Sequence, residues 1–327
     1  MFKLGPIVGA VLFAAALNAT LDLLHPEAPP RRPSRLPVVA QPPRPRHPGA
    51  VPKVLLVGID GCRPDALEAA AAPRLHGLIR GGAYASDLLV RLPGKSDTHT
   101  VSGPGWNTVL TGRWPHEHGI VANVFDPPLS LCADLFTWVH QARPASFSAS
   151  VASWPPINAH LAHADYAPAP PASDASYEEA DRAVNRTYLA QFARRVPDVS
   201  LVYYGQVDVE GHRGGFDPAN PRYLAAIARV DALLGEVLDA VARRPSESED
   251  WLILVTTDHG GHRCEHDFTT GAPAEVLHSF LIANGPGVEA GPIREQAYLV
   301  DVAPTALAYL GLRVASLPGR VRALSTR

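Results

Sequence analysis

Short hydrophobic runs alternate with stretches of helical periodicity from residue 53 to residue 310. Apolar runs of four to eight residues that end at Gly or polar residues predict buried strands, and apolar positions three and four apart predict helices. This alternation predicts an α/β fold, in which a mostly parallel central sheet is sandwiched by helices in three layers. The expected strands are 53–59, 83–90, 147–152, 201–207, 251–257 and 278–283, and the expected helices are 64–82, 131–141, 177–196, 221–244 and 301–310. Between them, residues 153–174 show no period and predict a long surface loop.

The amino-terminal residues 1–25 have a different pattern. Lys3 precedes an apolar run from Leu4 to Leu17, which is typical of a signal peptide. Leu21, Leu23 and Leu24 extend the run toward the length of a membrane helix, so an uncleaved anchor is an equal alternative, and a buried soluble helix is the third interpretation. We expect an exported protein that is periplasmic, extracellular or anchored to the membrane by this segment.

Residues 26–52 hold ten of the 33 prolines of the chain. Proline fixes φ and removes a backbone donor, so this segment predicts an extended linker that contributes little to a core. The sequence therefore predicts one folded domain at 53–315, followed by a carboxyl-terminal tail at 316–327.

Charge is unevenly distributed along the 327 residues. The first 50 residues carry six basic and two acidic side chains, which leaves 23 basic and 30 acidic side chains in the rest of a chain whose net charge is −3. The folded part has no basic surplus to neutralise a phosphate backbone, so duplex nucleic acid is excluded as an expected partner. No protein partner is predicted.

Metal-type side chains stand where three of the hydrophobic runs end. Asp60 follows the first run, Asp208 follows the run at 201–207, and Asp258 with His259 follows the run at 251–257. The carboxyl ends of parallel strands meet at one edge of a sheet, so these side chains are expected in one crevice. Carboxylate and imidazole ligands together suit Zn²⁺, and Mn²⁺ is the alternative. His212 and His266 lie four and seven residues beyond Asp208 and His259 and extend the set.

Ser102 begins a further segment, which indicates a candidate anion-binding site. It is followed by Gly103 and Pro104 and then by a helix-like run. A helix amino terminus presents free N–H groups and favours an anion such as phosphate. Taken by itself, a serine in this place is more often a helix N-cap, and only the surrounding motifs favour the anion site.

Taken in order, these segments resemble the alkaline phosphatase superfamily, and within it the type I phosphodiesterase/nucleotide pyrophosphatase branch. An ordered set of motifs is more specific than any single pattern. The segments are 58–65 (GIDGCRPD), 102–106 (SGPGW), 110–120 (LTGRWPHEHGI), 208–212 (DVEGH), 257–261 (TDHGG) and 301–311 (DVAPTALAYLG).

The resemblance implies a hydrolase of small-molecule phosphate esters that uses a serine nucleophile, two divalent metal ions and a covalent phospho-serine intermediate. Residues 53–315 would be its catalytic domain. One ion would be held by Asp60, Asp258, His259 and the oxygen of Ser102, and the other by Asp208, His212 and His266. His262 and His278 are alternatives for the last ligand.

Two departures from the family pattern bear on the substrate. Nucleotide pyrophosphatases usually carry Asn three residues after the nucleophile, where this chain has Gly105; Gly103, Asn107 and Trp106 are the remaining substrate-binding candidates. Sulfatases of the superfamily carry Arg four residues on, where this chain has Trp106. A phosphodiesterase is therefore expected, with a phosphomonoesterase or sulfatase-like hydrolase as the alternative and a non-catalytic envelope protein as the third.

Overall fold

The computed structural model of the chain describes residues 38–40, 47–92, 94, 98–125, 131–169 and 176–324. The expected signal peptide or anchor at 1–25 lies outside these ranges, as does most of the expected linker. The chain from Leu36 onward forms one compact unit. Across the described ranges, no helix has the length and apolar character needed to cross a membrane.

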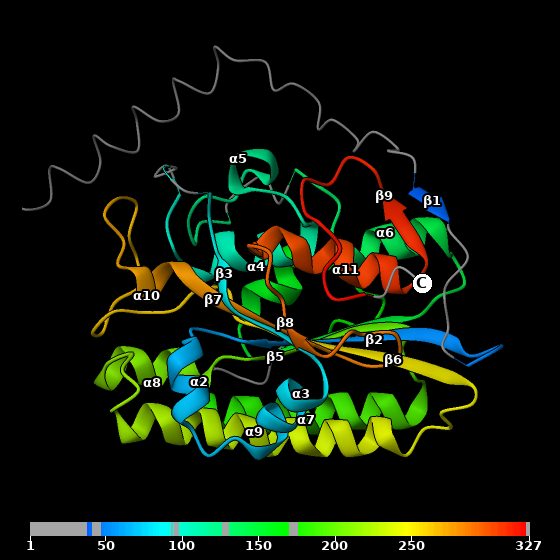
Figure 1. The fold of residues 1–327 in the computed structure, drawn as a ribbon, viewed down its shortest axis with the longest axis horizontal. Helices are drawn as coiled ribbons and strands as arrows, with labels where there is room; N and C mark the ends of the chain where they lie inside the picture. The colour runs from blue at the N-terminus through cyan, green and yellow to red at the C-terminus, as the bar shows by residue number, and fades with distance from the viewer. Residues whose placement is uncertain are drawn as a thin grey trace, which may run out of the picture. The chain divides into compact units, whose positions relative to one another are not determined.

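Within the described residues, seven strands form the central sheet, and six of them run in the same direction (Figure 1). Only β7 is antiparallel to its neighbours. This arrangement confirms the predicted α/β class with a mostly parallel sheet. In sheet order the strands are β4 (Ser148–Ala152), β5 (Val199–Tyr204), β2 (Val51–Ile59), β6 (Glu249–Thr256), β7 (His278–Asn284), β3 (Ala83–Leu89) and β8 (Gly291–Pro292). A separate two-stranded sheet pairs β1 (Val38–Ala40) with β9 (Leu312–Val314).

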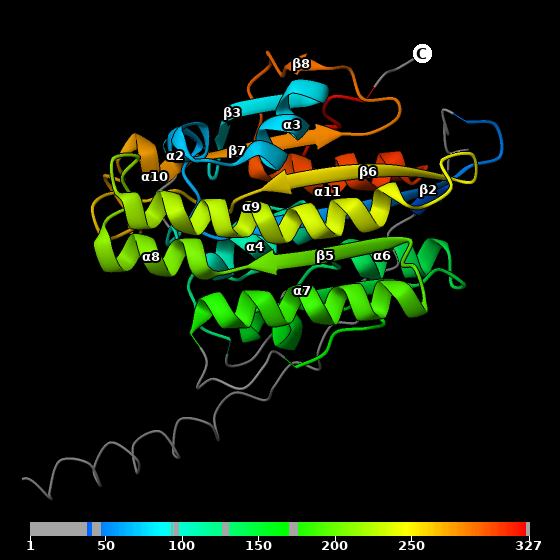
Figure 2. The same ribbon diagram turned by 90° about the horizontal axis from the view of Figure 1, so that it is seen from below.

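Helices cover both faces of the sheet and complete three layers (Figures 1 and 2). Alternate residues of β2 point to opposite faces: Val54 and Leu56 join one hydrophobic core, whereas Leu55 and Val57 join the other. On one face lie α2 (Pro64–Ala69), α3 (Pro73–Gly81), α7 (Tyr177–Arg194), α8 (Gln206–Gly214) and α9 (Pro221–Ala242). On the other lie α4 (Ser102–Thr111), α5 (Pro115–His118), α6 (Leu135–Ala142) and α11 (Val302–Tyr309). The shorter elements are α10 (Ala274–Leu277), the π-helical turn Ile157–Leu161 and the 3₁₀ turn Leu299–Asp301.

Three local predictions were wrong. The single helix expected at 64–82 is two helices, because Pro73 has no N–H for an ongoing helix and instead begins α3. The strand expected to reach residue 207 ends at Tyr204, and α8 begins at Gln206. The loop expected at 153–174 contains the turn Ile157–Leu161, whose two end residues are buried in the core.

Candidate active site

The carboxyl ends of β2, β5 and β6 bring the metal-type side chains close together. Asp60 directly follows β2, and Asp258 with His259 follows β6. After β5 the chain turns into α8, whose first turn holds Asp208 and whose next turn holds His212. Because β5, β2 and β6 are parallel neighbours, their ends meet at the same edge of the sheet.

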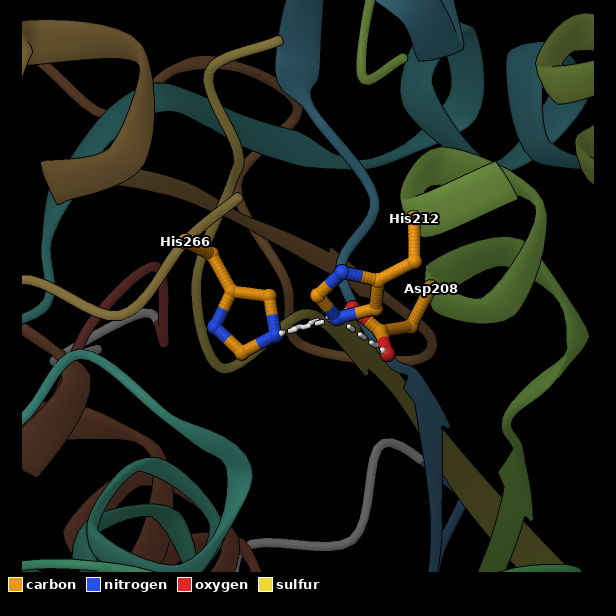
Figure 3. Close-up of side chains that lie close together, drawn as sticks. All are labelled: Asp208, His212 and His266. Atoms are coloured by element: carbon orange, nitrogen blue, oxygen red, sulfur yellow. Dashed lines mark hydrogen bonds and ion pairs between the residues drawn. The ribbon is translucent and has the colours of Figure 1, made fainter. Parts of the chain in front are cut away.

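Asp208, His212 and His266 form one group of candidate ligands (Figure 3). Asp208 and His212 are four residues apart on α8 and so share a helix face. His212 Nε2 lies 3.5 Å from Asp208 Oδ2 and 2.9 Å from His266 Nε2. Of the alternative histidines, His262 contacts Glu275 instead, at 2.6 Å. The structure therefore brings His266 to this group.

A second group shares Asp208 with the first. Single ligand atoms of Asp60, Asp208 and His259 lie within 4.8 Å of one another. Asp258 Oδ2 is 3.1 Å from His259 Nε2, and Ser102 Oγ is 3.4 Å from Asp60 Oδ1. The structure thus brings together all seven residues that the sequence suggested for metal binding and catalysis, and Asp208 belongs to both groups. Asp258 and His259 are buried, whereas the other five line one cleft.

The three imidazoles of this cleft are in the same tautomeric state. Nδ1 of His212, His259 and His266 lies 2.9 Å from the backbone carbonyl oxygen of Cys264, Gly260 and Thr100, respectively. A carbonyl oxygen only accepts, so each Nδ1 carries the hydrogen, and in the neutral ring each Nε2 presents a lone pair. This is how metal-binding histidines are commonly held.

The charges of the cleft favour a bound cation. Burial raises the pKa of Asp208 and Asp258 well above the usual carboxyl range, and the nearby Asp60 charge adds to both shifts. Burial lowers the pKa of His266 to about 2 and also lowers that of His259, so both rings are neutral at physiological pH. Among the described residues, no hydrogen-bond partner is present for Asp208 Oδ1, Asp258 Oδ2 or His259 Nε2, all of which are buried. Buried oxygen and nitrogen atoms that offer lone pairs and lack hydrogen-bond partners are suitable ligands for divalent metal ions.

Ser102 is the first residue of α4 and is buried at the floor of the cleft. The N-cap position belongs to Val101, and no side chain of the described residues caps this helix. The N-cap interpretation of Ser102 was therefore wrong. Its hydroxyl instead faces Asp60, next to the amino terminus of a ten-residue helix.

Asn123 is a cleft residue that the sequence did not reveal. Its Oδ1 accepts a hydrogen bond from the Gly103 N–H at 2.6 Å, and the residue lines the cleft with Ser102. Gly105, where an Asn was expected, has no room for a side chain because a Cβ there would lie 2.7 Å from the Cβ of Asp258. The amide comes from a loop after α5, and no local pattern around Asn123 signals it.

Two of the expected substrate-binding residues lie elsewhere. Trp106 and Asn107 have no exposed surface, because the face of α4 that carries them packs into the core. The indole N–H of Trp106 donates to Asp60 Oδ2 at 2.8 Å. The third candidate, Gly103, does lie next to Ser102, with its N–H donated to Asn123. Contact of Trp106 or Asn107 with a substrate is therefore a wrong prediction.

Asp181 of α7 fixes the start of α8, the helix that carries Asp208. Its carboxylate accepts the backbone N–H groups of Gly205 and Gln206, each at 3.0 Å. Burial raises the pKa of Asp181 to about 6 although these hydrogen bonds oppose the shift. Asp181 thus determines where α8 begins and, through it, where Asp208 lies.

The family profile described as type I phosphodiesterase/nucleotide pyrophosphatase matches residues 54–309, most of the chain. The chain belongs to this family. Among curated proteins it is 26% identical over 225 residues to an uncharacterized pyrophosphatase/phosphodiesterase of Schizosaccharomyces pombe, covering 63% of this chain and 44% of that protein. It is 24% identical over 250 residues to the human bis(5'-adenosyl)-triphosphatase ENPP4, covering 70% and 52%. The chain spans about half the length of these relatives.

A solved structure of the family has the same fold. Murine ectonucleotide pyrophosphatase/phosphodiesterase 5 aligns with a TM-score of 0.62 at 18% identity, over 82% of this chain and 97% of that one. At this identity the likeness concerns the fold alone. The predicted membership of the alkaline phosphatase-like phosphodiesterase family is confirmed by the profile match and agrees with this fold.

Proposed function

We propose that the chain is a metal-dependent hydrolase of phosphate esters, with Ser102 as nucleophile and a phospho-serine intermediate. The observation that carries the proposal is the grouping of three imidazoles and three carboxylates at one place, with the hydroxyl of Ser102 3.4 Å from Asp60 Oδ1. The family, and the pyrophosphatase, phosphodiesterase and triphosphatase activities for which its relatives are named, support the same class of reaction.

The donor atoms suggest two ions. Asp60, Asp258, His259 and Ser102 Oγ would hold one, and Asp208, His212 and His266 the other. The mixture of carboxylate and imidazole suits Zn²⁺, with Mn²⁺ as the alternative. Bound ions would supply Lewis acidity, which lowers the pKa of the serine hydroxyl and neutralises charge on the phosphoryl oxygens.

The residues of the chain then have distinct roles. Ser102 Oγ loses its proton to solvent and attacks phosphorus, the bond from phosphorus to the leaving oxygen breaks, and the leaving oxygen takes up a proton from solvent. The side-chain N–H of Asn123, whose Oδ1 is held by the Gly103 N–H, would donate to a phosphoryl oxygen as negative charge develops there. In the second half of the reaction, water attacks the same phosphorus and releases Ser102.

The charge of the cleft supports a diester substrate. Among the described residues that line it, none is Lys or Arg. A monoester brings two negative charges on its phosphoryl group near neutral pH and a diester brings one, so a cleft without basic side chains has less to offer the monoester. A phosphomonoesterase is the second candidate. The sulfatase alternative is weaker, because Trp106 stands in the place of the expected Arg and is buried.

We also propose that the protein is exported, on the strength of residues 1–25 alone. Separation of the periplasm, membrane and cytosol of an expressing bacterium, followed by mass analysis of the amino terminus, distinguishes a cleaved signal from an anchor. Recovery of the intact chain in the cytosol would contradict export.

Hydrolysis of three p-nitrophenyl substrates tests the proposed reaction. The bis-p-nitrophenyl phosphate diester should be cleaved faster than p-nitrophenyl phosphate or p-nitrophenyl sulfate. EDTA should abolish the activity, and zinc or manganese should restore it. Ser102→Ala should lower it by roughly 10³-fold or more, whereas Ser246→Ala, an exposed serine, should leave it unchanged. Activity that survives either EDTA or Ser102→Ala would refute the mechanism, and metal binding without hydrolysis would favour a non-catalytic protein.

A further inference from the structure

The two carboxylate oxygens of Asp60 have different surroundings. Oδ1 faces Ser102 Oγ at 3.4 Å and His259 Nε2 at 3.6 Å. Oδ2 accepts two hydrogen bonds, one from the indole N–H of Trp106 at 2.8 Å and one from the hydroxyl of Tyr203. Only Oδ1 is therefore directed toward the other candidate ligands.

The two donors come from elements on either side of Asp60. Trp106 lies on α4, one turn beyond Ser102, and Tyr203 lies near the end of β5. Their rings meet edge to face, with centroids 5.1 Å apart and an interplanar angle of 76°. Both side chains are buried, so water does not compete for their hydrogen bonds to Asp60.

Gly58 on β2 makes room for this arrangement. A Cβ at position 58 would lie 2.5 Å from the Trp106 ring, closer than real Cβ contacts allow. The indole therefore fills the space that a side chain on β2 would occupy, two residues before Asp60. The close approach holds the Trp106 N–H at the carboxylate.

We propose that Trp106 and Tyr203 are positioning residues that hold Asp60 as a monodentate metal ligand, which binds through Oδ1 alone. The χ2 torsion of aspartate, which rotates the carboxylate, has a broad distribution, so the rotamer alone does not decide which oxygen faces the metal. Two donors on Oδ2 fix that choice and leave Oδ1 for the ion. Because Trp106 is on the same helix as Ser102, it also links this ligand to the nucleophile. The inference rests on the proposed metal site.

Two conservative substitutions test the pair of hydrogen bonds from Trp106 and Tyr203 to Asp60 Oδ2, which we call the clamp. Tyr203→Phe removes one hydroxyl, and Trp106→Phe removes the N–H and shortens the ring. Partners that orient a metal ligand typically contribute about 10-fold to 100-fold in metal affinity. We expect a loss of zinc affinity in that range for each variant, measured by competition with a chromophoric zinc chelator.

The chain offers matched controls for both changes. Tyr188 is a fully buried tyrosine whose hydroxyl contacts Ser200 Oγ at 2.9 Å. Trp138 is a buried tryptophan whose Nε1 has no hydrogen-bond partner among the described residues. Tyr188→Phe and Trp138→Phe remove the same atoms away from the ligands, so their zinc affinity should stay close to that of the wild type.

The outcomes separate the clamp from the proposed function. If the wild type binds neither zinc nor manganese, the proposed site and the clamp both fail. If the wild type binds zinc and Tyr203→Phe binds it equally well, the clamp alone is overturned. Unfolding of each metal-free variant in urea shows whether it folds. Should Trp106→Phe not fold, the smaller change in Tyr203→Phe decides the matter.

Discussion

Asp208→Asn should stabilise the metal-free protein and destabilise the metal-bound one. Candidate ligand oxygens of Asp60 and Asp208 lie within 4.8 Å of each other, and burial raises the pKa of Asp208 well above its usual range. At an effective dielectric constant of about 20, two unit charges at that distance repel by about 3 kcal/mol. Because the native carboxyl can take up a proton instead, the gain in unfolding free energy of the metal-free variant should be about 1–3 kcal/mol.

Zinc should reverse the order of stability. A ligand at about 100 times its dissociation constant stabilises the wild type by about 2.7 kcal/mol, and the variant loses much of this because Asp208 belongs to both ligand groups. The assay is urea unfolding with EDTA and with zinc. The exposed Asp87→Asn serves as the control and should move neither curve. A variant less stable than the wild type in both conditions would refute the reasoning.

Three further predictions concern other residues. Burial lowers the pKa of His118 to about 3, so as pH falls below about 6.5 the imidazole is protonated in the unfolded chain first and the folded state loses stability. From pH 6.5 to 4.5 the unfolding free energy of the wild type, measured by urea titration, should fall by about 2 kcal/mol more than that of His118→Gln. Parallel curves for the two proteins would contradict this. Gly105→Ala should displace Asp258 and lower diester hydrolysis by about 10²-fold. Gly77→Ala, whose Cβ would meet only the end of the Arg80 side chain at 4.0 Å, should not, and equal rates for the two variants would be the contrary result. Asn123→Ala should lower the turnover number by about 10²–10³-fold with zinc content unchanged, and a variant that instead loses zinc would show that Asn123 has another role.

The fold and the positions of the candidate ligands were predictable where the sequence pattern is local. Buried runs such as 53–59 and 251–257 have strand length, and the polar residue that ends each run necessarily lies at the sheet edge. The family motifs supplied the roles. Asp208 was correctly expected near the other candidate ligands, but the secondary structure predicted for it was wrong, because it lies in α8 instead of at the end of a strand. Asp181, which fixes the start of α8, comes from a separate helix.

The surroundings of the ligands could not be read from the sequence. Asn123 meets Gly103 only because the loop after α5 folds back over α4. Trp106 was expected to contact a substrate. Instead, the indole occupies the space that Gly58 of β2 leaves free, and its N–H donates to Asp60. Such contacts join residues distant in sequence and depend on side-chain volume at several elements at once, which no periodicity records.

The stereochemical course at phosphorus tests the central claim most directly. A p-nitrophenyl phosphorothioate diester that is chiral at phosphorus would be hydrolysed by the zinc-loaded enzyme in heavy-oxygen water, and the configuration of the product determined. Two successive in-line displacements, first by Ser102 and then by water, each invert the phosphorus centre, so we predict overall retention. Inversion would mean that water attacks the substrate directly, and would contradict a covalent intermediate on Ser102.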